Sequence, residues 1–266
     1  MLSPQALLRR QPIIFFLAVA APAVAIFVAS DVSGDYENRQ LSSILFLAAG
    51  SMSFIVFFQE MYVFYATNSR RLLWMSAAFF TFGVGMFGST IAVGGSAGID
   101  RDSYVGNSEL LRVTSEFAAA IFILLGTLRS DRSIQGSMEF KAYIAVATIT
   151  VLVASAIIYL SAAQDTLSVP VYSSQYGWSP FSLYVELNVF VFFAAISIVC
   201  IGISRKNKSQ ILFWFIIGFV LMTFSELAFT MERVLMIGPA SSFVWLGKVF
   251  LLTASATFVL GLSKAR

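Results

Sequence analysis

Eight apolar segments constrain the fold of this chain of 266 residues more than any other feature. An α-helix needs about 20 apolar residues to cross the roughly 30 Å hydrocarbon core of a bilayer. The segments lie near residues 12–30, 42–66, 72–95, 109–128, 141–163, 181–203, 209–236 and 241–263. They are apolar on every side, whereas the strands of a transmembrane barrel alternate apolar and polar residues. The sequence therefore predicts an all-α membrane bundle of eight transmembrane helices, forming a single integral membrane domain over residues 1–266.

The basic residues between these segments predict the orientation of the bundle. Cytoplasmic loops of membrane proteins carry an excess of Lys and Arg. Twelve basic residues fall on one side of the predicted bundle: Arg9, Arg10, Arg70, Arg71, Arg129, Arg132, Lys141, Arg205, Lys206, Lys208, Lys264 and Arg266. The connections on the other side are mainly acidic, and we assign to them Glu109, Arg112, Glu232 and Arg233. Both termini are therefore expected in the cytoplasm. We expect segment 12–30, which follows two arginines, to be a retained helix, because no small-residue cleavage site follows it.

The composition excludes several classes of function. The chain has no His and one Cys, so the usual ligand sets of zinc, copper and haem cannot be assembled. It also has no Gly-rich phosphate loop and no His for general-base catalysis. The net charge of +3 comes from short basic clusters between apolar segments, which topology explains better than nucleic acid does. We expect no metal, no cofactor and no enzymatic activity.

Ionisable residues inside the apolar segments are the candidate site. Charges near the centre of a bilayer are costly, so they usually face the bundle interior and pair with one another. Glu116, Glu186 and Lys248 each lie about five to seven residues from the predicted outer end, which is roughly 8–11 Å deep. Glu226 differs in depth from Lys248 by about 5 Å, and adjacent antiparallel helices normally pack together. We therefore expect a Glu226–Lys248 ion pair.

The spacing of Glu226, Thr230 and Arg233 places these three residues on one helix face. With Glu116, Glu186, Lys248 and Trp245 they predict a polar ligand chamber in the outer half of the bundle. Purely structural interpretations compete with this one. Glu116 follows Arg112 by four positions and would form a local pair. Glu186 lies near a helix start where headgroup water is close, and a buried pair can set helix register without binding anything.

Two motifs in the last two segments resemble a known family. Ser225, Glu226, Phe229 and Thr230 match the Ser-Glu-x-x-Phe-Thr motif of membrane-associated sensor domains, specifically their third class. Lys248 matches the lysine of that family's Gly-His-x-x-Lys motif, whereas Val244 and Trp245 replace its Gly-His pair. The resemblance implies an eight-helix sensory module at the front of a bacterial or archaeal signalling protein. Any histidine-dependent ligand of the family cannot be carried over.

The expected function is a sensory or ligand-binding membrane module in the plasma (inner) membrane of a prokaryote. Its partners would be the lipid bilayer and a small-molecule ligand. Family members usually continue into a cytoplasmic output domain, but this chain stops three residues after Ser263. We therefore expect a cytoplasmic signalling partner or a homo-oligomer to supply the output. Two alternatives remain open, namely an accessory subunit of a larger membrane complex and a small-molecule transporter. A transporter would need polar residues that continue to the inner face.

Overall fold

The computed structural model describes residues 38–94, 101–128, 171–206, 210–239 and 241–263, together with 145–146, 149–150, 152–153 and 156. Six long helices make up most of this part of the chain: α2 (Arg39–Thr67), α3 (Arg70–Gly94), α4 (Arg101–Leu128), α6 (Pro180–Lys206), α7 (Gln210–Val234) and α8 (Ser242–Ser263). All six are long and apolar enough to cross a membrane. The all-α membrane fold is thus confirmed.

The count of helices differs from the prediction for the whole chain. Six spans lie within the described residues, and eight were predicted. The predicted helices near 12–30 and 141–163 fall outside the described residues, apart from the few helical positions between 145 and 156. The other six predicted segments all correspond to observed helices. One boundary was wrong by about two turns, because α4 begins at Arg101 and not near residue 109.

Local caps explain where α2 begins and ends. The Asn38 side chain accepts a hydrogen bond from the Leu41 backbone N–H at 2.9 Å and so caps the first turn. At the other end Asn68 adopts a left-handed conformation with φ of 52°, and its N–H donates to the Phe64 carbonyl. Asn tolerates this conformation better than most residues. The two asparagines therefore bracket the apolar run of α2.

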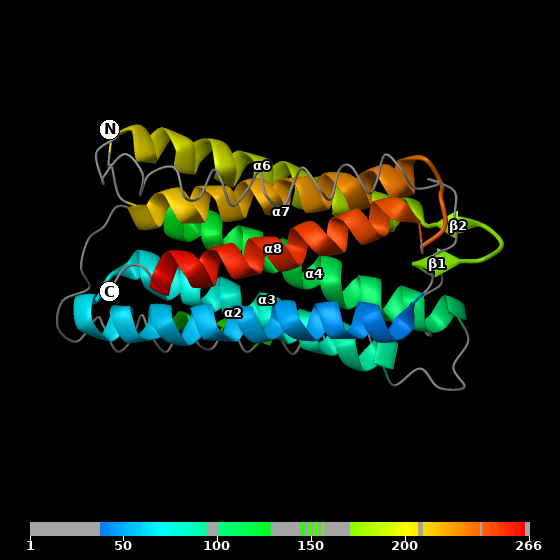
Figure 1. Cartoon of the computed structure of the whole chain (residues 1–266), viewed down its shortest axis with the longest axis horizontal. Coiled ribbons are helices and arrows are strands. Elements are labelled where there is room, and N and C mark those ends of the chain that lie inside the picture. Colours follow the sequence, from blue (N-terminus) through cyan, green and yellow to red (C-terminus); the bar gives the residue numbers. More distant parts are fainter. Residues whose placement is uncertain are drawn as a thin grey trace, which may run out of the picture.

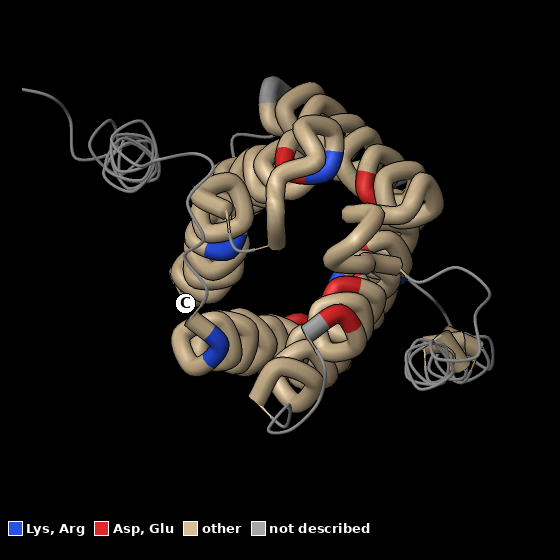
Figure 2. Tube along the Cα trace, turned by 90° about the vertical axis from the view of Figure 1, so that its right-hand side faces the viewer, with Lys and Arg blue, Asp and Glu red and all other residues tan. Residues whose placement is uncertain are grey.

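The six helices are arranged as a ring. Their contacts run in the order α2, α3, α4, α6, α7, α8 and back to α2. Figure 2, viewed along the bundle, shows this closed arrangement of helices around a common axis. Helices α2, α4, α6 and α8 run in one direction, and α3 and α7 run in the other (Figure 1). These directions agree with the alternation expected from the loops.

A short hairpin covers one end of the ring. Strands β1 (Tyr172–Ser173) and β2 (Gly177–Trp178) pair antiparallel, with Tyr172 opposite Trp178. Gly177 has a φ of 74°, a conformation that favours glycine. The Ser174 backbone N–H and hydroxyl both donate to Asp102 Oδ2, at 2.8 and 3.0 Å, which ties the hairpin to the first turn of α4. We call this end of the bundle the hairpin end (Figure 1).

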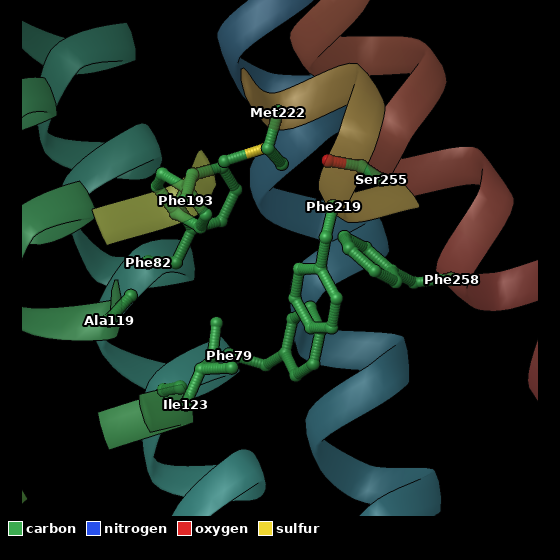
Figure 3. A pocket seen from close by; sticks show the side chains of 10 residues that line it. Phe79, Phe82, Ala119, Ile123, Phe193, Phe219, Met222, Ser255 and Phe258 are labelled. Atoms are coloured by element: carbon green, nitrogen blue, oxygen red, sulfur yellow. The ribbon is translucent and has the colours of Figure 1, made fainter. Parts of the chain in front are cut away.

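The middle of the bundle is filled by aromatic side chains. Phe79 of α3 packs against Phe258 of α8 with ring centroids 5.0 Å apart, and Phe258 packs against Phe219 of α7 at 5.1 Å. These rings border a small apolar cavity, shown in Figure 3. Its lining residues are Ala78, Phe79, Phe82, Ala119, Ile123, Phe193, Phe219, Met222, Ser255 and Phe258. We call this region the phenylalanine layer.

Candidate functional site

A buried cluster of charged side chains lies between the phenylalanine layer and the hairpin. Figure 2 shows acidic and basic residues on several helices at the end of the bundle that faces the viewer. We call the connected residues the charged network. They are Glu109, Arg112 and Glu116 of α4, Glu186 of α6, and Glu226, Glu232 and Arg233 of α7. Every one of them is at most 8% exposed.

Arg112 is the centre of the charged network, and it is completely buried. Its Nε and Nη2 donate to Glu109 Oε2 at 3.1 and 2.8 Å. Its Nη1 donates to Glu116 Oε2 at 2.5 Å, and its Nη2 also reaches Glu186 Oε1 at 3.0 Å. The guanidinium carbon lies 3.8 Å from the centroid of the Phe229 ring. Arg112 thus holds carboxylates of two helices against an aromatic face of a third.

Arg233 is the second guanidinium of the charged network. Its Nη2 donates to Glu109 Oε2 at 2.9 Å, and its Nη1 lies 3.1 Å from Glu186 Oε1. Glu109 and Glu186 therefore each bridge both arginines, which offsets the repulsion between the two guanidiniums. Arg233 Nε donates to the Ser182 hydroxyl at 2.9 Å. These contacts join α4, α6 and α7.

The hairpin adds Trp178 to this arrangement. Its ring lies 4.5 Å from the Arg233 guanidinium carbon, and its indole N–H donates to Glu232 Oε1 at 2.7 Å. The ring also contacts Tyr172 across the hairpin, with centroids 4.8 Å apart. A buried Trp normally needs a partner for its N–H, and Glu232 supplies one here. Trp178 therefore closes the charged network on its hairpin side.

Glu226 is the least satisfied member of the charged network. It is 0% exposed, and neither of its carboxyl oxygens has a hydrogen-bond partner. Its Oε2 lies 3.8 Å from Arg112 Nη1, too far for a hydrogen bond. Glu116 Oε1 and the Thr230 hydroxyl are likewise buried without a partner. Buried polar atoms without partners are rare in proteins, and each one calls for a physical explanation.

The predicted ion pair between Glu226 and Lys248 was wrong. Lys248 Nζ donates to the Ser42 hydroxyl of α2 at 2.9 Å. The ammonium also lies 4.9 Å from the centroid of the Trp245 ring and 5.3 Å from that of Phe46. Lys248 therefore faces α2 across the closing contact of the ring. Glu226 faces α4, where Arg112 is its nearest cation.

A comparison with protein families found one match that covers most of the chain. Residues 41–264 match the model of the membrane-associated sensor domain MASE3. The chain belongs to this family of membrane-associated sensor domains. The resemblance seen in the last two helices is thus confirmed over six helices. Searches of curated proteins and of solved structures gave no match.

In this membrane-associated sensor domain, the predicted site residues fall into two groups. Glu116, Glu186, Glu226 and Arg233 lie together in the charged network. Thr230 is buried one turn after Glu226 on α7. Lys248 and Trp245 lie together on α8 and form a second polar group with Ser42. The local Arg112–Glu116 pair is confirmed, although the pair is fully buried and belongs to a larger cluster.

Three members of the charged network were not among the predicted site residues, although Arg112 was expected to form a local pair with Glu116. Glu109, Arg112, Glu232 and Arg233 were counted with the outer connections, although they lie at the ends of the predicted segments 109–128 and 209–236. Helix α4 starts at Arg101 and α7 continues to Val234, so all four residues are helical and buried. The spacing of Glu109, Arg112 and Glu116 was the available signal, because positions i, i+3 and i+7 share a helix face.

Two further observations bear on the chemistry of the sensor domain. Within the described part of the chain, no group of three or more Asp, Glu, Cys or His side chains is placed to hold a metal ion. Toward the end opposite the hairpin, Glu60 of α2 is 1% exposed and both of its carboxyl oxygens lack a hydrogen-bond partner. The phenylalanine layer lies between Glu60 and the charged network, so the two acidic sites are separate.

Proposed function

We propose that this chain is a sensory and ligand-binding module whose recognition chamber is the charged network at the hairpin end. One observation carries the proposal. Five carboxyl groups and two guanidinium groups are buried together there, on three helices that the network joins directly. Such a cluster costs free energy in a membrane protein, and it usually marks a functional site.

We further propose that the chamber opens toward the outside of the cell. The basic residues Arg70, Arg71 and Lys206 lie at the end of the bundle opposite the hairpin, where α3 begins and α6 ends. The excess of Lys and Arg on the cytoplasmic side supports placing that end inside. In this arrangement the chain has eight spans and both termini in the cytoplasm of a prokaryote. Topology reporters at residues 69 and 207 would then report cytoplasm, and reporters at 102 and 172 the outside.

The phenylalanine layer favours a sensor over a transporter. A transport path would need polar groups between the charged network and Glu60. Phe79, Phe193, Phe219 and Phe258 occupy this region and are each at most 5% exposed. An apolar layer of this kind separates the polar chamber from the far end of the bundle. A signal would therefore pass from the chamber to the far end of the bundle through a movement of helices, without transport of a solute.

Helix α8 is the most direct path for such a movement. The Ser225 hydroxyl on α7 donates to the Gly247 carbonyl of α8 at 2.9 Å, next to Glu226 in sequence. A Cβ at Gly247 would lie 2.8 Å from the Phe229 ring, the ring that also covers Arg112. Helix α7 therefore contacts α8 at the same level as the chamber. A change in the network that shifts α7 would shift α8.

We propose that the module binds and does not catalyse, and that its output passes to a cytoplasmic signalling partner or a second copy of the chain. A fusion tests the sensory role. A nucleotide cyclase placed after Arg266 should change its activity severalfold when Glu186→Gln or Arg233→Gln alters the network. Gly202→Ala is the matched control, because nothing lies within 4 Å of a Cβ at this α6 position. Equal cyclase activity in all variants, at equal amounts in the membrane, would refute a sensory role for the network.

A further inference from the structure

The charged network contains more acids than bases. Its five carboxyl groups belong to Glu109, Glu116, Glu186, Glu226 and Glu232, and its two cations are Arg112 and Arg233. Lys248 on α8 is a further buried cation at the hairpin end, where its Nζ donates to Ser42. Even when Lys248 is counted, carboxyl groups outnumber cations by two in this part of the described structure. An ionised carboxylate without a cation is costly in a low-dielectric interior, so the excess negative charge needs a positive partner or a proton.

The guanidinium N–H groups are already engaged by other carboxylates. Arg112 Nε and Nη2 bind Glu109 and Glu186, and its Nη1 binds Glu116. Arg233 uses Nη2 for Glu109 and Nε for Ser182. Its Nη1 donates to the Phe229 carbonyl at 3.3 Å and lies beside Glu186. The carboxyl that remains without a donor is Glu226.

Glu226 and Glu116 approach the same nitrogen. Arg112 Nη1 lies 2.5 Å from Glu116 Oε2 and 3.8 Å from Glu226 Oε2. Glu116 Oε1 and both carboxyl oxygens of Glu226 are buried and have no hydrogen-bond partner. Two ionised carboxylates in this position would repel each other, and one guanidinium nitrogen cannot satisfy both. This is the arrangement in which a pair of carboxyl groups retains one proton.

We propose that Glu226 and Glu116 form a binding site for one proton, so that the ligand of the proposed chamber is the hydrogen ion. The sensory role of this site rests on the proposed function, whereas the presence of a bound proton does not depend on that function. An O–H bond forms at one of the two carboxyl groups with a proton from water or hydronium, and one negative charge disappears. The same O–H bond breaks when the proton returns to water.

Charged groups of α4, α6 and α7 surround Glu226. Arg112 and Glu116 approach from α4, Glu186 from α6, and Arg233 lies two turns further along α7. The charged residue of α8 at this end of the bundle is Lys248, whose Nζ donates to the Ser42 hydroxyl of α2 and not to Glu226. The site favours a proton over a metal ion, because a metal ion needs several oxygens that converge on one point. Among the described residues no group of three or more candidate ligands is placed in this way.

Loss of the proton would act on the contact between α7 and α8. A newly ionised Glu226 competes with Glu116 for Arg112 Nη1, and Arg112 rests on the Phe229 ring. Phe229 packs on Gly247, and Ser225 binds the Gly247 carbonyl. Proton release therefore changes the side chains that join α7 to α8. This makes external acidity the class of signal that the chamber is built to detect.

Infrared spectroscopy of the full chain in lipid nanodiscs tests the site. A protonated carboxyl gives a carbonyl stretch that an ionised carboxylate lacks. Wild-type protein labelled with ¹³C at Glu should show this band at neutral pH, and Glu226→Gln should lose it or reduce it. Glu60→Gln is the matched control, because it removes a buried carboxyl at the other end of the bundle and should retain the Glu226 band. Absence of the band from wild-type protein at neutral pH would overturn the proposal without any variant.

The pH dependence of stability is the second measurement. A proton that the folded state keeps and the unfolded state loses makes the unfolding equilibrium more favourable as pH rises, by about tenfold per pH unit for one proton. Glu226→Gln should flatten this dependence. Replacing Na⁺ and K⁺ by choline at constant ionic strength should leave the wild type unchanged. Stabilisation by Na⁺ that disappears in Glu226→Gln, without an acid band, would show a metal cation in place of the proton. The cyclase fusion tests the sensory role independently of the proton. If cyclase activity changes in the network variants but wild-type protein shows no carbonyl band, the proton site is refuted and the sensory role is retained.

Discussion

Arg112 Nη2 on α4 lies 3.0 Å from Glu186 Oε1 on α6, although the two residues are 74 positions apart in the chain. The same Glu186 oxygen lies 3.1 Å from Arg233 Nη1 on α7. One carboxyl group thus joins three consecutive members of the helix ring. All three side chains are completely buried, so water screens these charges little. Removal of any one of these partners is therefore expected to destabilise the hairpin end, because it leaves an opposite charge buried and unpaired.

The first prediction concerns Arg112. Arg112→Leu should strand the carboxylates of Glu109, Glu116 and Glu186 in the bundle interior, and should destabilise the fold by about 3–5 kcal/mol. Arg112→Lys keeps one charge but loses the planar fork, so it should lie between the wild type and Arg112→Leu. Unfolding in a mixed-detergent titration measures both. Stability equal to wild type in Arg112→Leu would mean that the carboxyl groups are neutral or hydrated without the guanidinium.

The second prediction separates the two polar groups at the hairpin end. A double-mutant cycle between Lys248→Met and Ser42→Ala should give a coupling energy of about 1.5–3 kcal/mol, because Nζ donates to the hydroxyl at 2.9 Å. The corresponding cycle between Lys248→Met and Glu226→Gln should give a smaller coupling. Thermal unfolding of the four proteins in each cycle provides the numbers. A larger coupling with Glu226 would restore the ion pair expected from the sequence.

The third prediction uses two helical glycines. A Cβ at Gly85 on α3 would lie 1.9 Å from Ser115 Oγ and 2.9 Å from the Leu111 carbonyl oxygen on α4. The backbone oxygen cannot move aside as a flexible side chain can, so Gly85→Ala should separate the two helices and cost about 1–3 kcal/mol or more. Gly202→Ala on α6 meets nothing within 4 Å and should cause no loss. Equal melting temperatures for the two variants would contradict the close α3–α4 contact.

Helix positions could be predicted from the sequence because the requirement for crossing a membrane depends on length and composition alone. The start of α4 is the instructive exception. The stretch from Arg101 to Ser108 is polar and was interpreted as a loop, but it is helical. Its polar groups are satisfied within the fold, as when Asp102 accepts from Ser174 of the hairpin. A search for apolar segments cannot detect polar helical turns of this kind.

The pairing of charges could not be predicted because depth along a helix does not determine its rotation. Glu226 and Lys248 were placed at similar depths on adjacent helices, and α7 and α8 do pack together. Their side chains nevertheless point to different neighbours, Glu226 toward Arg112 of α4 and Lys248 toward Ser42 of α2. The second contact joins residues 206 positions apart. It exists because α8 returns to α2 and closes the ring.

The last prediction concerns Trp178, which links the hairpin to the charged network. Trp178→Phe keeps an aromatic face for Arg233 and for Tyr172 but removes the indole N–H that donates to Glu232 Oε1 at 2.7 Å. Loss of a hydrogen bond to a charged group should cost about 1.5–3 kcal/mol, and it leaves Glu232 buried near Arg233 alone.

Tyr176→Phe is the matched control for this substitution. Tyr176 lies in the turn of the same hairpin and is 80% exposed, so loss of its hydroxyl should leave stability unchanged. Trp178→Ala should cost more than Trp178→Phe, because it also removes the ring from Arg233. The three melting temperatures in one detergent test this order. If Trp178→Phe has the melting temperature of the wild type and only Trp178→Ala has a lower one, then the aromatic ring, and not the hydrogen bond to Glu232, holds the hairpin on the charged network.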